Sequence, residues 1–306
     1  MRLVDLHCDV LYSLWKNPKK SFYAPNDLAV NAHWMEAFHQ MVQVMALYVP
    51  ISIPHNQRLP IVLQMIDIFH RDILSKGNKK YKWLRYAEDW SNLAPNEKGF
   101  VLSLEGCEAI SDDESVFWNL VDKGVQIFGL TWNYGNLLGD GIGETRKAGL
   151  SLQGKQFLRW CQRANAIVDV SHLNEKGFWD CMAVDVSVMA SHSNAKQICP
   201  HPRNLTDEQI QALICKEGIV GLTFVPEFLS ANPSLDDIVR HIEHICMLGG
   251  ENHLAIGSDF EGIDKPLACL NNLGDIPHLL DYLSKFFSDE LIQKICYKNF
   301  MHKILI

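Results

Sequence analysis

The sequence contains no long hydrophobic run. No segment reaches the roughly 18 consecutive apolar residues that a membrane-spanning helix requires. A signal-peptide pattern is also missing, because a strand-like segment begins almost at the first residue. We therefore expect a cytoplasmic protein that does not act at a membrane.

Positive charge and paired cysteines are scarce. The 28 Lys and Arg residues are outnumbered by 36 Asp and Glu residues, for a net charge of −8, and basic clusters do not exceed short pairs such as Lys79-Lys80. This balance argues against nucleic acid as a partner. The nine cysteines stand singly, with no Cys-x-x-Cys pair, which favours reduced thiols over a disulfide framework.

Glycine-rich dinucleotide or phosphate loops are absent after every expected strand, which disfavours a doubly wound open sheet, the alternative fold. Short apolar, β-branched segments instead alternate with longer segments of helical period, without a low-complexity linker. This order predicts one α/β domain over residues 1–306, a (β/α)8 TIM barrel with extra C-terminal helices at Ile276–Phe287 and Asp289–His302. The expected strands are Leu3–His7, Met41–Tyr48, Phe100–Glu105, Val125–Thr131, Ala166–Ser171, Val186–Ser191, Ile219–Phe224 and Leu254–Ser258.

Two segments depart from this alternation. Lys16–Asn31, with Pro18 and Pro25, and the glycine-rich Asn133–Gly149 are each expected to form a long loop. Both follow expected strands, so in a barrel both lie at the C-terminal face, where active sites are found.

Residues that bind metals follow several of the expected strands. After the first strand, His7 and Asp9 stand two residues apart, and such side chains point the same way along a strand, whereas Cys8 between them faces the core. A histidine at a strand end can simply border the core, and an aspartate there can cap the next helix. The C-terminal ends of barrel strands converge, however, so we expect six side chains to meet: His7, Asp9, Glu105, His172, His192 and Asp259.

The number of these side chains exceeds what one catalytic zinc needs, which is three protein ligands and a water. Three histidines and three carboxylates suit two ions about 3.5–4 Å apart, with one carboxylate bridging and a hydroxide held between the ions. The hydroxide would attack a carbonyl, and a separate carboxylate would carry the proton to a leaving amine.

The chain resembles the membrane (renal) dipeptidase family of zinc peptidases, within the amidohydrolase superfamily, over essentially its whole length. It resembles bacterial branches of that family in carrying Leu130-Thr-Trp-Asn133. The motifs that carry the resemblance are Asp5-Leu-His-Cys-Asp9, Ser103-Leu-Glu-Gly106, Leu130-Thr-Trp-Asn133, Asp169-Val-Ser-His172, Ser191-His-Ser193, Pro202-Arg-Asn204 and Gly257-Ser-Asp-Phe260.

The resemblance implies a (β/α)8 barrel with two zinc ions, although His and carboxylate ligands also accept manganese or iron. It implies that His7 and Asp9 bind the first ion, that His172 and His192 bind the second, and that Glu105 bridges the two. Asp259 matches the acid/base residue, and relatives suggest a homodimer.

The resemblance further matches Arg203 to the residue that binds the substrate's C-terminal carboxylate. From the sequence, Arg203 precedes a capping box, Thr206-x-x-Gln209, so it lies in the loop after the sixth expected strand. A guanidinium can grip a carboxylate there with two hydrogen bonds, and the alternative is a solvated surface salt bridge.

One position departs from the mammalian members, which carry histidine where this chain has Trp132. An indole N–H donates one hydrogen bond but cannot ligate a metal. Stabilisation of the substrate oxyanion therefore falls to zinc, Trp132 or Asn133, or Trp132 only shapes the pocket. These alternatives stay open.

The resulting hypothesis is a dizinc dipeptidase that hydrolyses L-Xaa-L-Xaa and L-Xaa-D-Xaa dipeptides by attack of a metal-bridging hydroxide. A binuclear amidohydrolase that cleaves a lactone, β-lactam or N-acyl amide is the alternative activity. A binding protein that keeps the barrel without catalysis is a third hypothesis, and only Trp132 favours it.

Overall fold

The centre of the fold is a closed ring of parallel strands. The computed structural model describes residues 1–24, 28–77 and 79–304. In this part of the chain eight strands close the ring in the order β2-β1-β9-β8-β7-β6-β5-β4, and β4 pairs back to β2. The ring strands are β1 (Arg2–Asp5), β2 (Gln40–Tyr48), β4 (Lys98–Glu105), β5 (Val125–Gly129), β6 (Ile167–Asp169), β7 (Val188–Ala190), β8 (Ile219–Leu222) and β9 (Leu254–Ile256). The predicted TIM barrel is confirmed.

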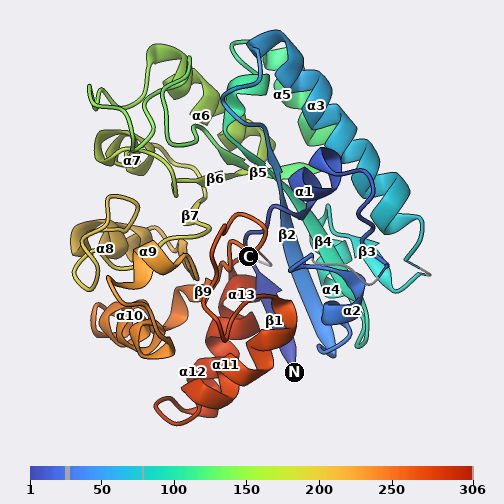
Figure 1. Cartoon of the computed structure of the whole chain (residues 1–306). Coiled ribbons are helices and arrows are strands. Elements are labelled where there is room, and N and C mark those ends of the chain that lie inside the picture. Colours follow the sequence, from blue (N-terminus) through green and yellow to red (C-terminus); the bar gives the residue numbers. More distant parts are fainter. Residues whose placement is uncertain (25–27, 78, 305–306) are drawn as a thin grey trace.

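Helices surround this ring (Figure 1). They are α1 (Val10–Lys16), α2 (Ala32–Met35), α3 (His55–Ile68), α4 (Ala87–Ser91), α5 (Glu114–Asp122), α6 (Leu152–Ala164), α7 (Glu175–Met182), α8 (Asp207–Cys215), α9 (Pro226–Leu229), α10 (Leu235–Met247), α11 (Ile276–Leu283), α12 (Asp289–Gln293) and α13 (Asn299–Ile304). Short turns complete them: η1 (Phe69–Leu74), η2 (Cys107–Ala109), η3 (Gly250–Asn252), η4 (Leu273–Asp275) and η5 (Lys294–Lys298). None of the helices in the described ranges is long and apolar enough to cross a bilayer.

The extra C-terminal helices are present, but the second is not continuous. The helix expected over Asp289–His302 consists of α12, the π-helical turn η5 and α13. Turn η5 packs against β1 and β9, so this end of the chain covers the outside of the barrel beside its first strand.

Strand β3 (Tyr81–Trp83) and helix α1 are among the elements that were not predicted from the sequence. Strand β3 pairs with the first residues of β4, on the edge that β5 occupies further along. Three residues are too few for an alternating pattern to be recognised. Helix α1 begins at Val10, directly after the first candidate ligands, and the loop expected from Lys16 therefore begins at Asn17. Pro25, within that loop, lies outside the described residues.

Several strands end earlier than predicted. Strand β1 ends at Asp5 rather than His7, and β9 ends at Ile256 rather than Ser258. The candidate ligands after these strands therefore lie in loops at the C-terminal face, where side chains no longer alternate. The long loop expected at 133–149 is confirmed, since no helix or strand is assigned to these described residues.

Local signals in the sequence explain how the helices are anchored. Thr206 caps α8: its hydroxyl accepts from Gln209 N (3.3 Å), and the Gln209 side chain accepts from Thr206 N (2.9 Å). The predicted capping box is thus confirmed, and it fixes the chain just after Arg203.

Aromatic rings also hold helices against the barrel. Between α5, β5 and α6, the rings of Phe117, Phe128 and Phe157 pack with centroids 5.0–6.0 Å apart.

Candidate metal centre

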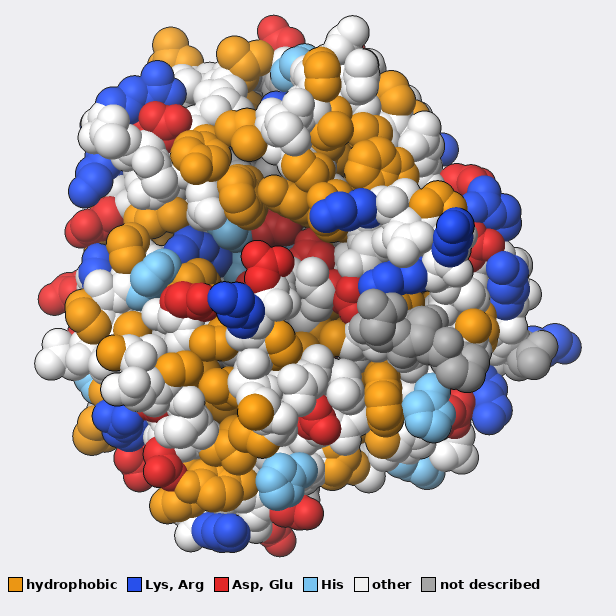
Figure 2. Space-filling model, in the orientation of Figure 1, with side chains coloured by type: hydrophobic (Ala, Val, Ile, Leu, Met, Phe, Trp, Pro, Cys, Tyr) orange, Lys and Arg blue, Asp and Glu red, His pale blue; other side chains and the backbone are white. Residues whose placement is uncertain are grey.

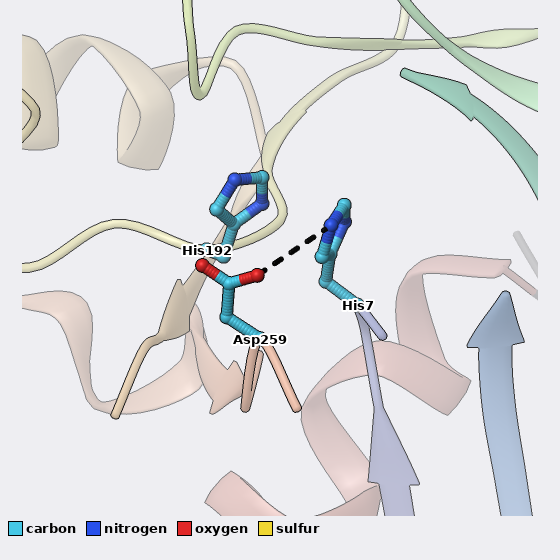
Figure 3. A group of neighbouring side chains, drawn as sticks. All are labelled: His7, His192 and Asp259. Atoms are coloured by element: carbon cyan, nitrogen blue, oxygen red, sulfur yellow. Dashed lines mark ion pairs between the residues drawn. The ribbon is translucent and has the colours of Figure 1, made fainter. Parts of the chain in front are cut away.

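Six candidate ligands meet at the C-terminal face of the barrel. They form three overlapping groups in which the ligand atoms all lie within 4.8 Å of one another: His7–Asp9–Glu105, Glu105–His172–His192 and His7–His192–Asp259. Figure 3 shows the third group, in which the side chains from three different strand ends point toward one another. In Figure 2, acidic and histidine side chains form the floor of a hollow in the middle of the visible face.

Glu105, the last residue of β4, lies between two pairs of ligands. Its Oε2 is 3.5 Å from His7 Nε2, and its Oε1 is 2.7 Å from His172 Nε2 and 3.7 Å from His192 Nε2. One oxygen therefore faces each half of the centre. A carboxylate in this position can contact a cation in either half of the centre.

His7 and Asp9 come together in a different way from that predicted. They do not share the face of a strand, because β1 ends at Asp5 and Asp9 stands at the N-cap of α1. The Asp9 carboxylate makes no side-chain capping bond within the described structure, and its Oδ2 instead lies 3.6 Å from His7 Nε2. The turn into α1 thus aims the carboxylate at the histidine.

Two buried atoms in this half of the centre lack a protein partner. Neither His7 Nε2 nor Asp9 Oδ1 makes a hydrogen bond to any residue within 1–24, 28–77 and 79–304. A buried polar atom without a partner costs about 1–3 kcal/mol. Atoms of this kind, on an imidazole and a carboxylate that face each other, fit a bound metal ion.

The charges favour a cation at His7. Burial lowers the pKa of His7, but the nearby Glu105 and Asp9 carboxylates outweigh burial and raise it well above its usual value. Glu105 itself is buried, yet His7 and His172 hold its pKa well below the usual range. The same negatively charged carboxylates that favour a proton on His7 also attract a divalent cation.

The other two histidines remain neutral. Burial, with Arg203 nearby, lowers the pKa of His172 to about 4, and burial, with His7 and Arg203 nearby, lowers that of His192 well below its usual value. His172 Nδ1 lies 2.8 Å from Asn133 Oδ1, so it donates its N–H there and leaves Nε2 with a lone pair. Asn133 thus orients a histidine, and its predicted contact with substrate stays a prediction.

Asp259 lies at the edge of the centre. Its Oδ1 is 3.9 Å from His7 Nε2, the ion pair drawn in Figure 3. Burial, reinforced by Asp9 and Glu105, raises the pKa of Asp259 to about 8. Its backbone has a φ of 65°, a left-handed conformation that costs an aspartate on the order of 1 kcal/mol or more, and its N–H donates to His7 O (3.2 Å).

Arg203 and Trp132 lie beside His172. Arg203 is only 5% exposed and donates to the backbone oxygens of Ser171 and His192. Its Nε has no partner in the described part of the chain, and burial lowers its pKa to about 10, so it stays charged at neutral pH. The Trp132 ring is 6.0 Å from the His172 ring and 5.5 Å from the Tyr48 ring.

The sequence analysis missed two buried aspartates that support these ligands. Asp5 ends β1 and accepts from Ser258, and Asp169 ends β6 and accepts from Ser171 and Ser191. The sequence did contain a signal for them: each aspartate ends an apolar strand, two residues before His7 in one case and three residues before His172 in the other.

Imidazole nitrogens and carboxylate oxygens, buried and partly without partners, are a donor set for divalent metal ions. At the C-terminal face of a TIM barrel, this set defines a metal-dependent hydrolase. The family model for membrane dipeptidase, peptidase family M19, matches residues 1–304. The chain belongs to this family, which implies a metal cofactor, and the resemblance seen in its motifs is confirmed.

Individual relatives agree with this assignment. An uncharacterized protein of the pqqA 5′ region of Klebsiella pneumoniae is 36% identical over 218 residues, 66% of this chain and 79% of that protein. Dipeptidase tcpJ of Claviceps purpurea is 28% identical over 255 residues, 80% of this chain but 59% of that protein, so the match spans less than two thirds of it. A metallo peptidase of Rhodobacter sphaeroides, solved with a phosphinate mimic of the dipeptide L-Ala-D-Ala, superimposes with a TM-score of 0.90 at 25% identity and covers 99% of this chain and 98% of that one.

Proposed function

We propose that this protein is a dizinc dipeptidase that hydrolyses the single peptide bond of small dipeptides. The observation that carries the proposal is the position of Glu105, whose two oxygens each face a separate pair of ligands. His7 and Asp9 would hold one ion and His172 and His192 the other, with manganese or iron as possible replacements for zinc. When bound, the ions supply a water of lowered pKa and polarise the substrate carbonyl.

Asp259 is the proposed acid/base residue. It lies partly buried beside His7, and its pKa of about 8 suits a carboxyl group that takes up and releases a proton near neutral pH. As the attacking water forms its bond to the carbonyl carbon, Asp259 accepts the water's proton. It then gives that proton to the departing amine as the C–N bond breaks.

Arg203 is the proposed partner of the substrate's C-terminal carboxylate. Its guanidinium is desolvated, charged and adjacent to the centre, and its Nε lacks a partner in the described chain. A carboxylate that accepts from this Nε–H and pairs with the guanidinium charge would fix the scissile bond a set distance away. Trp132 and Asn133, on the other side of His172, are the proposed contacts near the carbonyl.

The phosphinate mimic of L-Ala-D-Ala bound by the Rhodobacter sphaeroides protein supports L-Xaa-D-Xaa substrates, and L-Xaa-L-Xaa dipeptides are proposed beside them. We also propose that residues 1–306 form one barrel domain.

The experiment is hydrolysis of matched L-L and L-D dipeptides, with a lactone and an N-acyl amide as comparison substrates. We expect turnover of the dipeptides that a chelator abolishes and added zinc restores. Asp259→Asn should reduce turnover at least about 100-fold while the metal content stays that of the wild type. Metal-loaded protein that cleaves only the comparison substrates would contradict a dipeptidase.

A further inference from the structure

We propose that Asp169 is a positioning residue that acts through Ser191 to keep the ring proton of His192 on Nδ1. His192 Nε2 then carries a lone pair and can serve as a metal ligand. The inference deepens the proposed function, since it concerns one of the proposed ligands, but the protonation of the ring can be measured without any metal.

Asp169 sits where four hydrogens converge on one carboxylate. It is the last residue of β6 and is 8% exposed. Its Oδ1 accepts from Ser171 N (3.1 Å), Ser171 Oγ (2.8 Å) and Ser191 N (3.0 Å), and its Oδ2 accepts from Ser191 Oγ. Asp169 belongs to none of the ligand groups found in the described chain, so its role is to hold other residues.

The direction of these bonds fixes the proton on His192. Ser191 Oγ lies 2.7 Å from His192 Nδ1, and it also bonds to Asp169 Oδ2. A serine hydroxyl has one hydrogen, and a carboxylate only accepts. Ser191 therefore donates to Asp169 and must accept from His192, which requires an N–H at Nδ1.

The neighbouring serine does not change this direction. Ser171 Oγ is 3.3 Å from Ser191 Oγ, but it already donates to Asp169 Oδ1 and accepts from His192 N (3.1 Å). The Ser171 hydroxyl hydrogen is therefore already donated to Asp169 and cannot be donated to Ser191. The Ser191 hydrogen remains the one that satisfies Asp169 Oδ2.

A cation bound in the centre would then meet two lone pairs, one from each ring. His192 Nε2 lies 2.9 Å from His172 Nε2, whose own Nδ1 hydrogen is directed to Asn133. Both Nε2 atoms face Glu105 Oε1. An N–H on either Nε2 would point a hydrogen at the place where a cation must bind. The position of the ring proton therefore decides whether the histidine can act as a metal ligand.

Asp169→Asn tests this mechanism because only one orientation of the new amide group satisfies the surrounding hydrogen-bond donors. Two backbone N–H groups point at the Oδ1 position, so the amide oxygen must stay there and the NH2 group takes the Oδ2 position. The NH2 donates to Ser191 Oγ, whose hydrogen then turns to His192 Nδ1. That arrangement moves the ring proton of His192 to Nε2.

The measurement is ¹⁵N NMR of the histidine rings in metal-free protein, with zinc titration as a second readout. We expect wild-type His192 to carry its proton on Nδ1 and Asp169→Asn to carry it on Nε2. The variant's affinity for the ion at His172 and His192 should fall about 10–100-fold. Ser191→Ala, which removes the hydroxyl without adding a donor, should lose the Nδ1 preference and serves if Asp169→Asn does not fold.

Asp5→Asn is the matched control. Asp5 is likewise a buried aspartate at a strand end that accepts from a serine N–H (2.8 Å) and hydroxyl (2.6 Å), here of Ser258. In the described chain no hydrogen bond joins Ser258 Oγ to an imidazole ring; apart from Asp5, its contacts are with the backbone, at His7 O and Phe260 N. This variant should leave the His192 proton on Nδ1.

An Nδ1 proton on His192 in both Asp169→Asn and Ser191→Ala, or the same switch in Asp5→Asn, would overturn the inference. A wild-type Nδ1 proton that switches in Asp169→Asn, in a protein that binds no zinc, would instead uphold the positioning role and contradict the dizinc proposal.

Discussion

The clearest functional prediction concerns Arg203 and the carboxylate of the substrate. If this guanidinium binds the C-terminal carboxylate, a dipeptide should be a far better substrate than its C-terminal amide. Arg203→Met should remove that preference, because the neutral amide gains little from the guanidinium. The contrast between two substrates isolates the contact from any general damage that the substitution causes.

The size of the effect follows from the burial of Arg203. At 5% exposure the guanidinium is little screened by water. A hydrogen bond to a charged group contributes about 1.5–3 kcal/mol, and within the described chain the Nε–H of Arg203 is free to make one such bond. One bond corresponds to a roughly 10- to 150-fold preference in kcat/KM for the acid over the amide.

The assay is kcat/KM for one dipeptide and its amide with wild type, Arg203→Met and a control, Arg240→Met. Arg240 lies on α10 with its side chain 57% exposed and paired to Asp237, so its loss should leave the preference unchanged. A wild-type enzyme that hydrolyses both substrates equally well would refute the role of Arg203. An undiminished preference in Arg203→Met would refute it too.

Three further substitutions test the centre and the scaffold. Glu105→Gln should lose both ions, because each of its oxygens faces a different ligand pair, and metal content after gel filtration measures this; two retained ions would contradict the bridge. His241→Gln tests a buried histidine of α10 that accepts from Ala195 N (3.2 Å) and donates to Leu229 O (3.1 Å). Burial lowers its pKa to about 4. The unfolded chain therefore takes up a proton at His241 near pH 6.5, and wild type should lose up to about 3 kcal/mol of unfolding free energy relative to the variant between pH 6.5 and pH 4. Urea titrations at several pH values measure the difference, and a constant difference would show that His241 titrates normally. Phe117→Ala, in the ring cluster between α5 and α6, should cost about 3–5 kcal/mol in the same assay; a cost below about 1 kcal/mol would show that the site collapses.

The barrel and the meeting of the ligands could be predicted from the sequence. Apolar strands that end in a histidine or carboxylate recur along the chain, and parallel strands in a closed ring place those ends on one face. Glu105 shows why this succeeds: it ends a largely apolar strand, β4, whose register against β2 places it beside Tyr48. Residue type and position at a strand end were sufficient there.

The finer geometry depends on loops and hydrogen-bond directions that the pattern of apolar residues does not record. The approach of Asp9 to His7 results from the start of α1, not from strand alternation. The contact of Asp169 with Ser191 depends on the register of β6 against β7, where Asp169 pairs with Met189. Strand β3 was missed because three residues give too little pattern to distinguish a strand from a loop.

The proposed function requires two metal ions that share Glu105. Anomalous diffraction from crystals of the zinc-loaded protein would locate each ion. We predict two peaks, one bound by His7 and Asp9 and the other by His172 and His192, with Glu105 joined to both. A single peak, or two peaks without Glu105 between them, would contradict the account.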